Sequence, residues 1–286
     1  MKKIVVSGAN GQLGSELREL SVSYPNYEWF FADRTQLSLD NLVGLEAQLQ
    51  LLKPDILFNC AAYTAVDKAE KEQDLANTIN HLAVAALAKY AHANDVLFIH
   101  VSTDYVFDGS QDKPLLEDEP TAPINVYGHT KLAGEKAAMY HNPDTIIIRT
   151  SWVYSEFGNN FVKTMMRLMA EREEISVVDD QFGSPTYAAD LADVMMKIVE
   201  FPSWKPGIYH YSNEGRVSWF EFAKAIQLIG GFECQINGIA TLNYPTPAAR
   251  PSFSLLNKSK IKSTFNIEIP NYVTSLQKCM SKLRSR

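Results

Sequence analysis

Short apolar runs that alternate with amphipathic stretches restrict the fold of this chain more than any other feature. The clearest runs are rich in β-branched residues and cover 4–6, 56–60, 97–101 and 146–148. Near-continuous apolar runs of this length are typical of parallel strands buried on both faces. Between them lie stretches with apolar residues at helical spacing, at 12–20, 42–52 and 74–91. Strands that alternate with helices predict βαβ units and an α/β fold with a doubly wound parallel sheet.

The second half of the chain has a looser pattern. After about residue 150 aromatic and polar residues mix, and a loop-rich stretch contains Pro245, Pro247 and Pro251. We therefore expect a nucleotide-binding domain over 1–150 and a smaller C-terminal lobe over most of 151–286. Segments near 175–200 and 207–230 are expected to return to the first domain. Within them, the apolar runs at 175–178 and 208–211 are expected to add strands to its sheet.

Composition argues against several classes of partner. The 286 residues carry a net charge of -6, without a run of Lys and Arg that could neutralise a nucleic-acid backbone. The N-terminal apolar run stops at Ser7, and no stretch approaches the roughly 18 apolar residues of a membrane span. The three cysteines lack metal-ligand spacing. We expect a cytoplasmic protein with reduced thiols and no bound metal, and neither nucleic acid nor membrane as a partner.

A glycine-rich turn follows the first expected strand and opens the first expected helix. Residues 8–14 read Gly-Ala-Asn-Gly-Gln-Leu-Gly. Glycines there let the backbone turn tightly and approach a pyrophosphate, which the free N–H groups at the helix start bind. The turn predicts a dinucleotide site made of Gly8, Asn10, Gly11, Gln12, Leu13 and Gly14.

The end of the second expected strand bears on the choice of dinucleotide. The strand at 28–32 is followed by Asp33 and Arg34, about 20 residues past the glycine turn, where a side chain normally meets the adenosine ribose. An aspartate accepts hydrogen bonds from the ribose hydroxyls of NAD, whereas an arginine pairs with the 2′-phosphate of NADP. Both residue types are present, so the sequence predicts NADPH or NADH as the cofactor.

A tyrosine and a lysine lie four residues apart at the start of a helix expected over 132–140. This spacing places Tyr127 and Lys131 on one helix face. A fixed ammonium beside a phenol is expected to lower the tyrosine pKa, so that Tyr127 passes a proton to a carbonyl oxygen as hydride reaches the carbon. Lys131 can also hold the ribose hydroxyls of a nicotinamide.

Hydroxyl side chains follow the expected strand at 97–101. Ligands of open α/β folds bind at the carboxyl ends of the strands. Ser102 or Thr103 can therefore hydrogen-bond a substrate carbonyl there, and Asp104 can orient a sugar hydroxyl. The spacing alone does not choose between Ser102 and Thr103.

With these residues in view, the chain resembles the dTDP-4-dehydrorhamnose reductase family of the extended short-chain dehydrogenase/reductase superfamily. The resemblance covers nearly the whole length. It rests on the segments 59–70, 102–107, 125–128, 149–154, 180–186 and 244–251. It implies a Rossmann-like doubly wound sheet with a smaller C-terminal substrate-binding lobe.

The resemblance also implies roles for individual residues. Thr103, Tyr127 and Lys131 would be the catalytic triad. The residues implied beside the nicotinamide half of the cofactor are Ala61, Ala62 and Tyr63, and those implied to face the sugar are Thr64, Val66, Asp104 and Trp152. Arg250 is implied for the diphosphate, and an arginine in a proline-rigid loop suits a bidentate phosphate contact. Trp152 fits a core aromatic equally well.

At two places the sequence departs from the family, which affects the roles that the resemblance implies. The family tends to carry an aspartate near the adenine, where this chain has Ser38 and Leu39, so the adenine contacts of these two residues are open. Some members form a metal-bridged dimer through carboxylates. Glu16 matches one such position, but Ala189 stands where a second acidic residue is expected. We therefore predict no metal, and a homodimer stays open.

The leading hypothesis is reduction of the C4 keto group of a dTDP-linked deoxy keto sugar, dTDP-4-dehydro-L-rhamnose, to dTDP-L-rhamnose. The hydride would come from NAD(P)H and the proton from Tyr127, with Thr103 polarising the carbonyl, in a polysaccharide pathway. One alternative keeps this chemistry and yields another dTDP-6-deoxyhexose, such as the C4 epimer dTDP-6-deoxy-L-talose. Another is a non-catalytic NADP-binding regulatory subunit, against which the complete triad argues.

Overall fold

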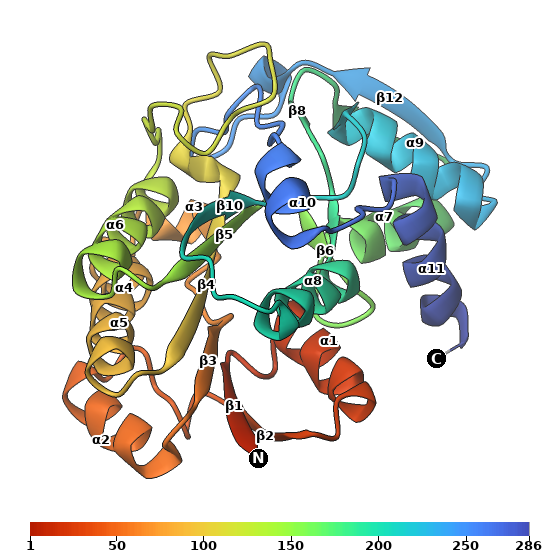
Figure 1. Cartoon of the computed structure of the whole chain (residues 1–286). Coiled ribbons are helices and arrows are strands. Elements are labelled where there is room, and N and C mark those ends of the chain that lie inside the picture. Colours follow the sequence, from red (N-terminus) through yellow and green to blue (C-terminus); the bar gives the residue numbers. More distant parts are fainter. Residues whose placement is uncertain (286) are drawn as a thin grey trace.

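A parallel β-sheet forms the centre of the protein, described by a computed structural model that covers residues 1–285 (Figure 1). Within these residues the main sheet has six strands in the order β10-β5-β4-β3-β1-β2, and every neighbouring pair is parallel. Their bounds are β1 (Lys2–Ser7), β2 (Tyr27–Ala32), β3 (Ile56–Asn59), β4 (Leu97–Thr103), β5 (Ile146–Thr150) and β10 (Gly207–His210). The expected doubly wound parallel sheet is confirmed.

Helices cover both faces of this sheet (Figure 1). One face packs against α2 (Leu42–Leu52), α5 (Ala83–Ala93) and α6 (Val126–His141). The other packs against α1 (Gln12–Leu20), α8 (Ala188–Glu200) and α10 (Ser259–Phe265). Successive residues of a strand point to opposite faces, so Ile4 and Val6 enter one core and Val5 the other. Burial on both faces explains why the strands read as unbroken apolar runs.

Short helical segments connect β3 to α5. They are α3 (Val66–Ala69), α4 (Gln73–Asn77) and a π-helical turn, η2 (Thr78–Leu82). A 3₁₀ turn, η3 (Asp104–Val106), follows β4. These segments lie at the carboxyl ends of the strands, where they can contribute side chains to a ligand site.

A second hydrophobic core lies beyond the main sheet, on the side of β12 and α9 in Figure 1. Its helices are α7 (Phe161–Glu171), α9 (Trp219–Gly230) and α11 (Tyr272–Ser285). Its strands pair in twos: β6 (Val153–Tyr154) with β9 (Thr186–Tyr187), β8 (Phe182–Gly183) with β11 (Val217–Ser218), and β7 (Glu174–Val178) with β12 (Gln235–Ile239). Two further 3₁₀ turns are η1 (Ser21–Ser23) and η4 (Thr241–Asn243).

The two strands expected to return to the main sheet behave differently. β10 pairs with β5 at the edge of the main sheet, as expected. The expectation for 175–178 is wrong, because β7 pairs with β12 instead. Ile175 and Val177 are buried while Glu174 and Ser176 are exposed. Such alternation suits a strand with one face in solvent, unlike the strands of the main sheet. The domain boundary near residue 150 stays a prediction.

The helices of residues 1–285 include none that is long and apolar enough to span a bilayer. Even α6, the longest of them, has 16 residues, whereas a transmembrane helix needs about 20. In the same part of the chain Cys60, Cys234 and Cys279 are unpaired.

Candidate active site

The glycine turn after β1 is built for close backbone contact. Gly8 has a φ of +69°, and a Cβ there would lie 2.8 Å from the backbone of Ala61. A Cβ at Gly14 would lie 2.4 Å from the carbonyl oxygen of Gly8. Gly11 is the N-cap of α1, so the helix begins directly after the turn with the N–H groups of its first residues outside the helical ladder. The turn therefore offers an anion-binding helix start without side chains in the way.

A cavity of about 770 Å³ opens at the carboxyl ends of the central strands, beside this turn. Residues from the ends of β1, β3, β4 and β5 line it. The sequence-predicted residues that line it are Gly8, Gly11, Gln12, Leu13, Arg34, Leu39, Ala61, Ala62, Tyr63, Thr64, Tyr127 and Lys131. The structure thus brings the predicted glycine turn and the Tyr-Lys pair together around one space.

Other predicted site residues are outside the lining of this cavity, as far as the described chain shows. They are Asn10, Gly14, Asp33, Ser38, Val66, Thr103, Asp104, Trp152 and Arg250. Gly14 is buried against the turn itself, where it allows α1 to pack closely. Thr103 and Asp104 are buried and follow the lining residue Ser102 in the sequence.

Some lining residues had no role assigned from the sequence. Lys68 and Glu72 lie shortly after β3 and line the cavity, and Glu72 accepts a hydrogen bond of 2.6 Å from the Tyr63 hydroxyl. Lys68 lies within α3 and Glu72 follows that helix, so the position of β3 alone does not point to them. Gly158 and Asn159 also line the cavity. They carry no local signal, because only the tertiary fold brings the loop after β6 to the glycine turn.

Helix α6 positions the Tyr-Lys pair. Its N-cap is Asn125, whose side chain accepts a 2.8 Å hydrogen bond from the backbone N–H of Gly128. The helix starts at Val126, earlier than expected, so Tyr127 lies in its first turn. The ring of Tyr127 packs edge-on against Tyr105 with 5.5 Å between centroids. The pair is therefore fixed by a capped helix start and an aromatic contact.

The environment of Tyr127 does not lower its pKa, contrary to the expectation. Burial raises the pKa of Tyr127 to about 12; the neighbouring hydroxyl of Thr103 lowers it, and the Asp104 carboxylate raises it further. Lys131 donates a 2.7 Å hydrogen bond to the carbonyl of Val101 instead. Burial also lowers the pKa of Lys131 to about 8. The phenol therefore keeps its proton at neutral pH.

The residues after β4 form a small buried polar group. The Thr103 hydroxyl donates to the Asp104 carboxylate at 3.0 Å and accepts from the N–H of Tyr105 at 3.2 Å. Burial raises the pKa of Asp104 to about 6, while the neighbouring Ser254 and the hydrogen bond from Thr103 lower it. The hydroxyl of Ser102 is buried with no hydrogen-bond partner among residues 1–285. The Thr103 hydroxyl is thus bonded to its neighbours, whereas the hydroxyl of Ser102, which lines the cavity, has no hydrogen bond to any described residue.

The charged residues after β2 are engaged with their own loop. Asp33 accepts hydrogen bonds from the backbone and hydroxyl of Thr35 at 2.8 and 2.7 Å. Arg34 pairs with Asp40 at 2.6 Å, and Ser38 donates to the same carboxylate. These hydrogen bonds hold the pKa values of Asp33 and Asp40 below their usual range. Arg34 and Asp40 line the cavity, so an ion pair stands where the ribose end of a dinucleotide is expected.

Trp152 and Arg250, the two residues implied for the substrate, already have partners. Trp152 has a φ of +49° and stacks on Trp219 with 3.6 Å between ring centroids. Arg250 binds both carboxylate oxygens of Asp67 at 3.0 and 2.8 Å. The substrate roles of both stay predictions.

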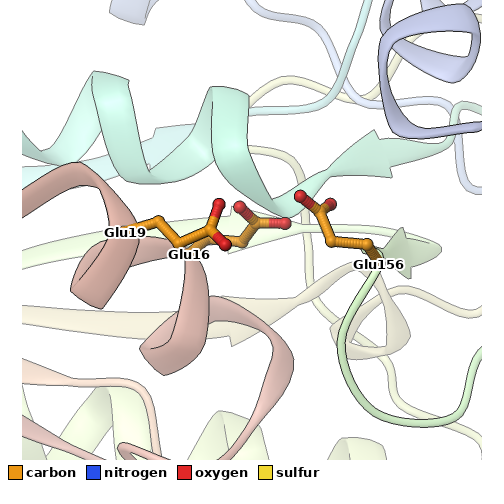
Figure 2. A group of neighbouring side chains, drawn as sticks. All are labelled: Glu16, Glu19 and Glu156. Atoms are coloured by element: carbon orange, nitrogen blue, oxygen red, sulfur yellow. The ribbon is translucent and has the colours of Figure 1, made fainter. Parts of the chain in front are cut away.

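An acidic cluster joins α1 to the loop after β6. Glu16, Glu19 and Glu156 each place a carboxylate oxygen within 4.8 Å of the other two (Figure 2). The ammonium of Lys282 lies 2.8 Å from Glu156 and 3.3 Å from Glu19, so the chain itself supplies positive charge here. Burial and the neighbouring Glu156 raise the pKa of Glu16 to about 8. The absence of a metal from the protein stays a prediction.

Comparison with known proteins assigns the family. The chain matches the model of the RmlD substrate binding domain over residues 1–285. The dTDP-4-dehydrorhamnose reductase of Escherichia coli strain K12 is 41% identical over 291 residues, which cover 98% of this chain and 97% of the relative. The dTDP-4-dehydrorhamnose reductase of Bacillus anthracis in complex with NADP has a TM-score of 0.94 at 39% identity, covering 99% and 100% of the two chains. The reductase of Clostridium acetobutylicum reaches 0.94 at 36% identity, covering 99% of each. This chain therefore belongs to the dTDP-4-dehydrorhamnose reductase family.

Proposed function

We propose that this protein reduces the C4 keto group of dTDP-4-dehydro-L-rhamnose to dTDP-L-rhamnose, with NAD(P)H as hydride donor and Tyr127 as proton donor. Family membership supports a reductase that acts on a dTDP-linked keto sugar. The relative from Bacillus anthracis, crystallised with NADP, supports the cofactor. The observation that carries the chemical step is the position of Tyr127 and Lys131, which line one cavity beside the glycine turn while the phenol keeps its proton because its pKa is raised to about 12.

The residues around the glycine turn fit a nicotinamide dinucleotide. The absence of a side chain at Gly8 and Gly11 leaves the start of α1 open to a pyrophosphate. We assign the nicotinamide half to the cavity wall formed by Ala61, Ala62 and Tyr63. The adenosine ribose is assigned to the wall near Arg34. When bound, the cofactor supplies the hydride that reaches the carbonyl carbon.

The side chains of Tyr127, Thr103 and Lys131 then carry out the proton transfer. As negative charge develops on the carbonyl oxygen, Tyr127 donates its phenolic proton, and the C4 hydroxyl and a phenolate result. Because burial keeps the pKa of Tyr127 at about 12, the phenol carries this proton at neutral pH. The hydroxyl of Thr103 orients the phenol, and a charged Lys131 stabilises the phenolate.

The test is a reductase assay with both nicotinamide cofactors and the keto sugar. Replacement of Tyr127 by Phe should lower kcat by about 10²- to 10⁴-fold, the range of general acid catalysis, and leave the Kd of NADPH unchanged. Tyr140→Phe is a matched control, since Tyr140 lies on the same helix but is 82% exposed. Proton couplings of the product distinguish the rhamnose from its C4 epimer.

Three outcomes would contradict the proposal. Absence of cofactor oxidation with the keto sugar would remove the substrate assignment. Unchanged turnover in the Phe variant would remove Tyr127 as the proton donor. An axial C4 hydroxyl would make the product the talose epimer.

We also propose that the enzyme works in the cytoplasm. Cys60, Cys234 and Cys279 are unpaired in the described chain, which suits a reducing compartment. A homodimer remains a prediction that sedimentation velocity can test.

A further inference from the structure

A row of buried polar side chains crosses three strands of the main sheet. Ser7 on β1 is in register with Asn59 on β3, and Asn59 is in register with His100 on β4. Each of the three side chains is completely buried. On the next strand, β5, the registered position is the apolar Ile147. The row therefore begins at the glycine turn and ends at His100.

The row connects directly to Lys131. The Ser7 hydroxyl lies 2.6 Å from Oδ1 of Asn59, and Nδ2 of Asn59 lies 2.9 Å from Nδ1 of His100. The other ring nitrogen of His100, Nε2, lies 3.4 Å from Nζ of Lys131. At the opposite end, Ser7 accepts a 3.2 Å hydrogen bond from the N–H of Ala61 in the cavity wall.

Packing alone does not require polar residues at these positions. Two residues earlier on the same strands, the same face of the sheet carries Val5, Leu57 and Phe98, which form part of a hydrophobic core. A buried polar group costs free energy unless it is hydrogen-bonded, so an apolar row would be the simpler solution. The row is fully bonded and ends at the lysine of the proposed active site, which points to a role for that lysine.

The role of the row follows from which of its atoms donate and which accept a hydrogen bond. An ammonium donates but cannot accept, so a charged Lys131 requires a lone pair on Nε2 of His100. The ring is neutral, because burial and the charge of Lys131 hold the pKa of His100 well below its usual value. Nδ1 then carries the ring proton and donates to the amide oxygen of Asn59, which requires the amide to be turned by a half-turn from its orientation in the structure, with its N–H directed at the Ser7 hydroxyl.

A neutral Lys131 reverses every donor and acceptor in the row. Its lone pair accepts from Nε2–H, and Nδ1 accepts from the amide N–H of Asn59. The oxygen and nitrogen of the Asn59 amide exchange places by a half-turn between the two arrangements, and the orientation in the structure, with Nδ2 facing Nδ1 of His100, is the one that suits a neutral Lys131. Both protonation states of Lys131 can thus be bonded by the same three side chains.

We propose that His100 is a positioning residue for Lys131, and that its change of tautomer, matched by the amide of Asn59, holds the lysine in both protonation states. This inference rests on the proposed function, in which Lys131 stabilises the phenolate. The other charged or titratable groups that face Lys131 are Cys60 after β3 and, on α6 itself, Tyr127 and Glu135. Glu135 is paired with Arg149 of β5 at 2.7 Å.

Nitrogen NMR of the free protein, labelled with ¹⁵N-histidine, tests the tautomer change without any substrate. The His100 signals are identified by their loss in His100→Gln. We expect Nε2 to change from unprotonated to protonated as the pH rises through about 8, where Lys131 loses its proton, while the ring stays neutral. In Lys131→Met the tautomer should not depend on pH. A tautomer that is constant from about pH 6 to 10 in the wild type, or equal changes in both proteins, would overturn the proposal.

Kinetics test the consequence for catalysis. In His100→Leu the ammonium loses an acceptor, so the alkaline limb of the kcat profile should move to lower pH by about one unit. His100→Gln, whose amide oxygen can accept from Lys131, should restore most of this shift. Ile147→Val, beside His100 in the same core, is the packing control and should lower stability without moving the profile.

The outcomes separate this inference from the proposed function. An unmoved profile in both His100 variants would reduce His100 to a packing residue. If the keto sugar is not turned over at all, the proposed function fails, and the NMR result still decides the role of His100. If His100→Leu does not fold, the Gln variant and the NMR titration remain decisive.

Discussion

Thr103 and Ser102 are neighbouring hydroxyl residues at the end of β4, and their surroundings differ. Thr103 donates its hydroxyl proton to Asp104 and lies outside the cavity lining, whereas Ser102 lines the cavity and its hydroxyl has no partner in residues 1–285. A hydroxyl polarises a substrate carbonyl by donating its single proton, so Thr103 would have to give up its hydrogen bond to Asp104 to take this role. The role of Thr103, which the family resemblance implies, therefore stays a prediction that has to be tested against Ser102.

Replacing Thr103 by Val should lower kcat by about 10²-fold, the lower range for losing one oriented donor. Thr103→Ser keeps the hydroxyl and should retain most of the activity. Steady-state kinetics of both variants, with circular dichroism as a check of folding, measure this effect. A larger loss in Ser102→Ala than in Thr103→Val would transfer the role to Ser102.

Glu16 makes stability depend on pH. Its pKa in the folded protein is about 8, above the ordinary value of 4.5, because it is buried beside Glu156. Between these values the folded state holds a proton that the unfolded chain has released. The stabilising contribution is therefore complete below pH 4.5 and is lost as the pH rises through about 8.

The unfolding free energy should fall across this window by up to about 1.4 kcal/mol per pH unit. Glu16→Gln, which keeps the neutral shape, should remove most of this slope. Urea unfolding at several pH values between 5 and 8 measures it, within the window that the two pKa values set. The same slope in the variant would assign the pH dependence to another group.

At the level of elements, the sequence correctly predicted the strands and the turn that a local residue pattern encodes. β1, β3, β4 and β5 are apolar runs because both of their faces are buried, and the glycine turn reads directly from its spacing. β7 was placed in the wrong sheet, because a five-residue strand does not encode its partner. The pairing of Arg34 with Asp40 also escaped prediction, since it depends on the conformation of the loop between β2 and α2.

This loop controls the choice of cofactor in our interpretation. Asp40 competes with a 2′-phosphate for Arg34, so Asp40→Asn should raise the preference for NADPH over NADH in kcat/KM. Arg34 is 71% exposed, and exposed ion pairs contribute less than about 1 kcal/mol, so the expected increase is at most about fivefold. Arg34→Ala should shift the preference toward NADH.

Glu28→Gln provides the control for this prediction. Glu28 forms a comparable exposed ion pair with Lys3 at 2.9 Å, outside the cavity lining. Its removal should leave the ratio of the two cofactors unchanged. Equal ratios in wild type and Asp40→Asn would show that Arg34 does not meet the cofactor phosphate.

At the scale of the whole molecule, contacts between distant segments complete the site. Asp67 in α3 and Arg250 are 183 residues apart and form a forked ion pair. Asn125, which caps α6, also donates to the carbonyl of Ala249 at 2.7 Å. The proline-rich loop is therefore fixed to both α3 and the start of α6. No local pattern encodes such contacts. A role for Arg250 was therefore implied by the family resemblance and could not be predicted from periodicity.

The position of Arg250 leads to the last prediction. Its guanidinium already binds a carboxylate in the forked geometry that suits a diphosphate, so substrate binding would exchange one anion for the other. Arg250→Lys keeps the charge but not the fork, and the KM for the dTDP sugar should rise about tenfold, equivalent to about 1.4 kcal/mol. The KM for NADPH should not change, because Arg250 lies outside the cavity lined by the glycine turn. Stability should fall by less than about 1 kcal/mol, since Asp67 is 41% exposed. An unchanged KM for the sugar would mean that Arg250 fixes the loop to α3 without touching the substrate.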